Sequence, residues 1–380
     1  MEIDLQFAAI LRNCDDRILP VLEDEDLARF LRRIDFHGIA CIMSDRLPAE
    51  ANLPDALRAE LRERVVRAEM WELEHRATLA TALSTLDAAG ITPLLLKGTA
   101  VAYRHYERPA QRMRGDTDIL VARTDFERAI EVLVNTGGQA SAMAAGPVAG
   151  CARHVLFEGT TGTVHEIDVH HDLNGHAALR GLFDFEALAA QAVQLPGIAP
   201  TARAPSDIDT LLIAVMHRLK HRQSAYYVNG TLYLSADRLI WLMDIHCLAE
   251  SLGREDWEQV VDRARTKGLT GALLAGLEAA CEVLGAQVPE RVLERLAGAD
   301  AGRPSRFLEA GVLGQMLMDL RAMQSMRDRI RFLSELAFPP ADHMRSAFGH
   351  VRPNWLPWLY LYRAGRGTRV LWSGDWGGAR

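Results

Sequence analysis

Residues 91–121 constrain the fold more than any other part of the chain, because they combine a buried strand, a basic segment and two alternating carboxylates. An apolar run over residues 91–96 is bounded by glycines and predicts a strand that is buried on both faces. Five lysine and arginine side chains follow before Gly115, and an acid-apolar run over 116–122 predicts a second strand. Carboxylates next to cations indicate a site for metal and phosphate.

Asp116 and Asp118 alternate along the second strand, so their side chains lie on one face with Cα atoms ~6.6 Å apart. Two such carboxylates can bind Mg²⁺, which prefers a few protein carboxylates together with phosphate oxygens of the substrate. A third carboxylate, Asp168, lies between apolar residues in a later predicted strand over 163–169. We therefore expect Asp116, Asp118 and Asp168 to form a two-metal site and to be the catalytic residues.

A single Asp-x-Asp pair is more often a turn or a helix start, and the chain itself contains such a case. Asp207 and Asp209 follow Pro205 and Ser206 and precede a strongly apolar helical pattern. There the acids are expected to stabilise a helix N-terminus through the helix dipole. The metal assignment for Asp116 and Asp118 therefore depends on their strand context.

The turn after the first strand offers groups that bind phosphate. Gly98 allows the backbone to approach an anion closely, and Thr99 supplies a hydroxyl and an N–H at the start of a short helix. Lys97, Arg112 and Arg114 can neutralise a triphosphate, and arginine suits two-point contact with phosphate oxygens. These five residues are the predicted nucleotide-binding residues, although surface cations are often merely solvated or paired with nearby acids.

Composition indicates an ordinary globular protein, with 49% hydrophobic and 24% charged residues. A net charge of -7 disfavours nucleic acid as the main partner. The five cysteines form no close pair, the N-terminus carries acids where a signal peptide needs positive charge, and no apolar run is long enough for a transmembrane segment. We expect a cytoplasmic protein with reduced thiols.

The order of predicted elements indicates an α+β fold, with a small mixed sheet and flanking helices. We expect an N-terminal helical cap over 1–60, a catalytic core over 61–200, an all-helical domain over 201–335 and a proline-rich aromatic tail over 336–380. A helix over 126–135 should end at a glycine pair, and a hairpin should join strands near 153–157 and 163–169.

Histidines near Asp168 raise the alternative of a zinc site. Adjacent His170 and His171 point to opposite faces of a strand, so they cannot both bind one metal easily. His217 and Lys220, on the predicted helix after Ser206, are open candidates for triphosphate contact. Asp244 is expected to pair or cap within the helical domain.

Taken together, these motifs resemble the nucleotidyltransferase superfamily that includes DNA polymerase β, and most closely its uncharacterised nucleotidyltransferase family. The resemblance covers roughly residues 70–250 and depends on a set of short motifs. They are Leu96-Lys97-Gly98, Arg108-Pro109, Arg112 with Arg114, Gly115-Asp116-Thr117-Asp118, and Asp168-Val169-His170. His171 stands where many members have tryptophan, and the spacing from Gly98 to Asp116 is longer than usual.

The resemblance implies an enzyme that uses Mg²⁺ to transfer a nucleotidyl group from ATP or another NTP. Its acceptor would be a hydroxyl or phosphate on a small molecule, a peptide or a protein, and pyrophosphate would be released. Two alternatives stay open. One is a nucleotide-binding or regulatory protein without turnover, and the other is a kinase-like enzyme that transfers the γ-phosphoryl group.

Overall fold

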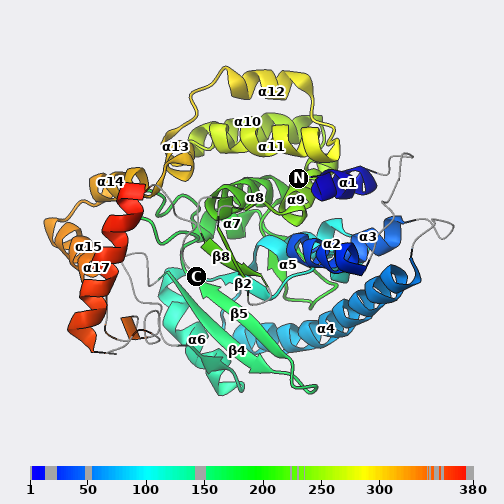
Figure 1. Cartoon of the computed structure of the whole chain (residues 1–380), viewed down its shortest axis with the longest axis horizontal. Coiled ribbons are helices and arrows are strands. Elements are labelled where there is room, and N and C mark those ends of the chain that lie inside the picture. Colours follow the sequence, from blue (N-terminus) through cyan, green and yellow to red (C-terminus); the bar gives the residue numbers. More distant parts are fainter. Residues whose placement is uncertain are drawn as a thin grey trace.

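The computed structural model describes residues 2–12, 24–47, 54–141, 151–222, 225–228, 231–234, 236–339, 341, 344–345, 351 and 355–373. A small mixed sheet is surrounded by many helices (Figure 1), which confirms the predicted α+β class. Residues 142–150 and the end of the predicted tail, 374–380, lie outside the described residues.

The central sheet has five strands in the order β1-β2-β5-β4-β3. Their bounds are Leu94–Leu95 (β1), Asp116–Leu120 (β2), Gln139–Ala140 (β3), Ala152–Glu158 (β4) and Val164–His170 (β5). Only β2 and β5 pair in parallel, and the other neighbours are antiparallel. The parallel pair needs a crossover, which contains helix α6 (Phe126–Asn135). This helix has the predicted bounds.

One face of the sheet is covered by α6 and by the long helix α4 (Asp55–Ala88). Ile119 and Val169 from the strands join Leu83 and Leu133 from these helices in one apolar cluster. Side chains alternate along a strand, so Asp118, next to Ile119 in β2, projects toward the other face. The buried strands therefore fix which side carries the acids.

The other face of the sheet turns toward a helical half. It contains α8 (Asp207–Arg222) and α9 (Leu239–Ser251), and Leu120 packs in a cluster with Leu212 of α8. The start of α8 is as predicted, because the Asp209 N–H donates to the Ser206 hydroxyl at 3.3 Å. Further elements are α7 (Phe185–Ala190), β6 (Val193–Gln194), β7 (Arg203–Ala204), α10 (Arg254–Lys267), α11 (Thr270–Leu284), α12 (Glu290–Ala297) and α13 (Arg303–Glu309).

A two-stranded hairpin interrupts this helical series between α8 and α9, formed by β8 (Ala225–Val228) and β9 (Thr231–Leu234). The N-terminal helices are α1 (Glu2–Leu11), α2 (Asp24–His37) and α3 (Ala40–Arg46). Their core includes Phe30 and Ile34, and it is shared with Trp241 of α9. The N-terminal helices thus pack on the helical half as well as beside α4.

Three more helices follow α13, namely α14 (Val312–Ala322), α15 (Met326–Ala337) and α17 (Leu356–Ser373). Helix α17, red in Figure 1, lies beside α15, where the sequence predicts only a proline-rich aromatic tail. In the described part of the chain, no helix is both long enough and apolar enough to cross a bilayer.

Candidate active site

The predicted carboxylates meet because of the register of two neighbouring strands. In the parallel pair of β2 and β5, Asp116 lies opposite Glu166, and Asp118 lies opposite Asp168. On the far side of β5, His154 of β4 is the register partner of Asp168. Side chains that are register partners project to the same face, so this face of the sheet carries a row of acids with two histidines, His154 and His170.

Asp118 is buried and is held by two partners. Lys97 Nζ donates to Asp118 Oδ1 at 2.5 Å, and His170 Nε2 lies 2.8 Å from the same oxygen. Burial alone would raise the pKa of Asp118, but Lys97 and His170 outweigh it and hold that pKa far below its ordinary value. Asp118 is therefore a carboxylate with full negative charge, which is the form that binds a cation.

Asp168 is shared by two groups of potential metal ligands. Asp118, Asp168 and His170 offer one set of donor atoms, all within 4.8 Å of one another, and His154, Glu166 and Asp168 offer a second set. His154 Nδ1 lies 2.5 Å from both Asp168 Oδ1 and Glu166 Oε1. Asp168 Oδ1 is nevertheless buried without a well-aligned hydrogen bond. Donor sets that are rich in carboxylate oxygen fit a hard cation such as Mg²⁺.

Asp116 stands at the exposed start of β2 and belongs to neither of these three-residue groups. Its side chain reaches solvent, yet enough protein surrounds it that lost hydration, followed by repulsion from Asp118, raises the pKa of Asp116 to about 7. With this raised pKa, the Asp116 carboxyl is partly protonated near neutral pH. A bound cation would favour loss of this proton and leave a charged ligand. Asp116 therefore shares the face of Asp118 but lies further out.

The Lys97-Gly98-Thr99 turn divides between the two faces of the sheet. Lys97 adopts a left-handed backbone with φ +49°, uncommon for a residue with a side chain, and reaches Asp118. A Cβ on Gly98 would lie 3.1 Å from Arg112 Cζ, so this position must stay small. The Thr99 hydroxyl lies 2.8 Å from that of Thr117, on the face away from the acids. The structure brings Lys97, but not the Thr99 hydroxyl, to the carboxylates.

Arg112 and Arg114 both pair with internal acids. Arg112 is buried and makes a two-point contact with Asp244, with Nε–Oδ1 and Nη2–Oδ2 both at 2.7 Å. Arg114 pairs with Glu72 and donates to Thr99 Oγ1 at 3.1 Å. The partner of Asp244 is thus an arginine of the core, and not a residue of the helical half as expected.

A model of the family described as "Uncharacterised nucleotidyltransferase" matches residues 23–285. The chain belongs to this family. The match includes the sheet, the carboxylate row and helices α8 and α9, and it ends before α12. No curated protein matches the chain. Membership in the nucleotidyltransferase family supports a transferase that uses a nucleotide, and it leaves helices α14, α15 and α17 outside the match.

The helical half also brings basic groups within electrostatic reach of the acids, since Asp118 influences Lys220 and Asp116 influences Arg238. Burial lowers the pKa of Lys220 on α8, and repulsion from Lys97 lowers it further. Burial and then Arg112 lower the pKa of Arg238 to about 10. The Arg238 Nε donates to Phe36 O at 2.6 Å, and this guanidinium forms no ion pair with a described carboxylate. Half-buried cations whose pKa is lowered by neighbouring positive charge, as for Lys220 and Arg238, favour the binding of an anion beside them.

Two members of the row, His154 and Glu166, were not singled out from the sequence as site residues. Glu166 and His170 share the predicted face of Asp168, so strand alternation was the available signal for both. His154 joins them only through the register of β4 with β5. The half-buried His217 has a strongly lowered pKa, caused first by loss of hydration and then by His221.

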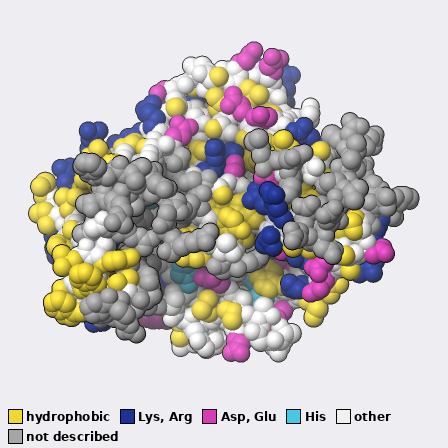
Figure 2. Space-filling model, viewed as in Figure 1, with side chains coloured by type: hydrophobic (Ala, Val, Ile, Leu, Met, Phe, Trp, Pro, Cys, Tyr) yellow, Lys and Arg dark blue, Asp and Glu magenta, His cyan; other side chains and the backbone are white. Residues whose placement is uncertain are grey.

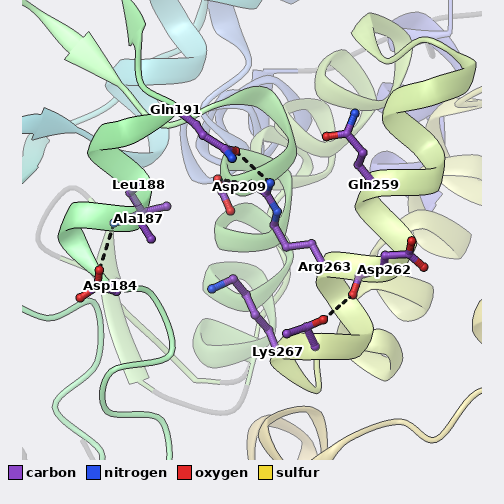
Figure 3. Close-up of a pocket in the computed structure, with 10 residues that line it drawn as sticks. Asp184, Ala187, Leu188, Gln191, Asp209, Gln259, Asp262, Arg263 and Lys267 are labelled. Atoms are coloured by element: carbon purple, nitrogen blue, oxygen red, sulfur yellow. Dashed lines mark hydrogen bonds and ion pairs between the residues drawn. The ribbon is translucent and has the colours of Figure 1, made fainter.

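A separate pocket lies between α7, α8 and α10 (Figure 3), with a volume of about 470 Å³. Arg263 crosses it and pairs with Asp209 at 2.5 Å and with Gln191 at 2.9 Å. No predicted site residue lines this pocket. A second pocket of 470 Å³ lies at the N-terminal end of β2, where Trp71, Arg112 and Gly115 are among its lining residues. Asp116, Asp118 and Asp168 are not among the residues that line it.

Proposed function

We propose that this nucleotidyltransferase uses Mg²⁺ to transfer an NMP group from an NTP to an acceptor, with release of pyrophosphate. The acceptor atom would be a hydroxyl or phosphate oxygen on a small molecule, a peptide or a protein. The observation that carries the proposal is the in-register pair of Asp118 and Asp168 on parallel strands. Asp116 lies two residues away on the same face.

In this proposal Asp116, Asp118 and Asp168 hold the metal ions. Bound Mg²⁺ would supply an activated acceptor oxygen and offset the charge that develops on the leaving pyrophosphate. His170 keeps Asp118 in position through its contact at 2.8 Å. Asp168 Oδ1, which lacks a well-aligned hydrogen bond, would accept the proton of the acceptor hydroxyl.

The triphosphate would lie between the acids and the basic groups of the helical half. Lys97 and the backbone of Gly98 would contact phosphate directly, together with Arg238. Thr99, Arg112 and Arg114 would support the phosphate turn from behind, because their side chains already have partners within the protein. Burial and repulsion from Lys97 lower the pKa of Lys220, and burial and repulsion from Arg112 lower that of Arg238, so a bound triphosphate would offset both effects.

The test uses immobilised full-length protein, a cell extract as the source of acceptor, Mg²⁺ and NTP labelled at either the α or the γ phosphate. We expect the α label in a product and pyrophosphate in solution. Asp118→Asn and Asp168→Asn should each lower the labelled product about a thousandfold, because metal contributes several kcal/mol to such transition states.

Asp262→Asn is the matched control, since Asp262 is 71% exposed and lines the separate pocket. It should retain full transfer. Transfer of the γ label with ADP as by-product would assign a kinase-like reaction instead. Nucleotide binding without any labelled product would favour a regulatory protein. Equal product with Asp118→Asn and with the control would refute the assigned site.

A further inference from the structure

The C-terminal helices expose apolar side chains that no described segment covers. Met326, Ile330, Leu333, Phe338, Trp355 and Leu361 are each 46–68% exposed, and we call them the C-terminal apolar surface. Figure 2 shows hydrophobic side chains gathered at the edge of the molecule where Figure 1 places α15 and α17. Single exposed apolar residues are common, but a contiguous group marks an interaction surface.

Helical periodicity and internal contacts show that the folded helices present this surface. Met326, Ile330 and Leu333 recur at spacings of four and three, so they lie on one side of α15, whereas Phe332 is buried. The Tyr360 hydroxyl donates to Pro339 O, and its ring lies 5.8 Å from that of Phe338. These contacts join α17 to the end of α15, so the surface has a defined shape.

Helix α14, which precedes α15, contacts the segment that follows β5. Asp319 of α14 is buried, lies 2.8 Å from His176 Nδ1 and accepts from the Ala178 N–H at 2.9 Å. Helix α14 is thus attached to the segment that follows β5, and α15 follows α14 in the chain after three residues.

Charge distinguishes this region from the rest of the chain. Residues 312–373 contain nine arginines and four acids, a net charge of +5, while the whole chain carries -7, so the remainder carries -12. Helix α17 contains arginines and no acid at all. Two copies of this surface would repel each other, whereas an anionic surface would attract it.

We propose that the C-terminal apolar surface docks onto an anionic lipid membrane, with α15 and α17 lying in the headgroup region. Helices with an apolar side, tryptophan and tyrosine at the boundary and arginines around it bind such interfaces. The apolar side chains would leave water for the acyl boundary, and the arginines would contact lipid phosphates. The region lies outside residues 23–285, so the proposal is independent of the nucleotidyltransferase function.

The test is co-sedimentation of the full-length protein with vesicles. Vesicles of phosphatidylcholine mixed with phosphatidylglycerol should bind the protein, and vesicles of phosphatidylcholine alone should not. Ile330→Glu and Leu361→Glu should each weaken binding at least about tenfold, since each removes a buried apolar group and adds a repelled charge. Arg327→Ala should weaken it about fivefold, the effect of one basic residue near an anionic surface.

The matched control is Leu73→Glu, because Leu73 is a leucine of α4 that is 61% exposed and far from these helices in sequence. It should bind vesicles as the unmodified protein does, and circular dichroism should show that all variants stay folded. No binding to anionic vesicles would overturn the proposal. So would equal binding to both vesicle types, or a concentration-dependent dimer in solution that Ile330→Glu abolishes.

Discussion

Replacing Arg112 by methionine tests how the core and the helical half are joined. Both Arg112 and Asp244 are buried, and the pair makes three contacts between 2.7 and 2.9 Å. The Tyr106 hydroxyl also donates to Asp244, at 2.9 Å. The substitution would therefore leave a buried carboxylate with one neutral donor in place of a guanidinium.

The expected cost is about 3 to 5 kcal/mol of unfolding free energy, as for other buried pairs that lose one partner. Asp244→Leu should cost a similar amount, because it leaves the Arg112 cation buried and unpaired. The double variant should cost only about 1 to 2 kcal/mol, since no charge remains and the main loss is the hydrogen bond of Tyr106. The two single effects are thus strongly non-additive.

Urea unfolding of the four proteins, followed by circular dichroism, measures these values by linear extrapolation. A coupling energy of at least about 2 kcal/mol supports the structural role of the pair. Additive effects, or a cost below about 1 kcal/mol for Arg112→Met, would refute the reasoning, because surface pairs are worth no more than this. Arg112 would then be available for direct nucleotide contact.

Two further predictions concern the carboxylate row. Lys97→Met should tighten Mn²⁺ binding in the absence of nucleotide, because the Lys97 ammonium neutralises the Asp118 carboxylate. Calorimetric titration measures this affinity, and weaker binding by the variant would contradict the prediction. The close contacts of His154 with Asp168 and then Glu166 raise the pKa of His154 to about 10 and so contribute to stability. Its stabilising effect should be complete below pH about 6.5 and be lost as the pH rises toward about 10. Urea unfolding with chelator should show that His154→Gln removes this part of the pH dependence, and an unchanged profile would exclude it.

Sequence reasoning located the strands because their apolar and acidic residues alternate. Asp118 and Asp168 each sit between apolar neighbours, and only one register buries those neighbours against α4 and α6. The end of α6 is predictable because Gly137 and Gly138 follow its C-cap, Thr136. Local pattern and burial thus fixed the acidic face before any contact was known.

Contacts between distant segments were not predictable in the same way. Arg112 and Asp244 are 132 residues apart, and each has several chemically suitable partners in the sequence. The Thr99 hydroxyl turns away from the acids because α5 (Lys97–His105) begins at Lys97, a rotation that a motif does not specify. Arg112 and Arg114, which belong to the motifs shared with the family, were therefore predicted to contact phosphate. The structure shows that both form internal ion pairs.

In the proposed two-metal site, the parallel pairing of β2 with β5 would make metal affinity a measure of long-range order. The two strands are separated in sequence by α6, β3 and β4, so no short fragment of the chain contains both Asp118 and Asp168. A slip of one residue would put Thr117 or Ile167 in their place. During refolding, a helical signal can return before this register is set, and tight metal binding can return only afterwards. A metal titration would therefore separate a compact helical state from the native one.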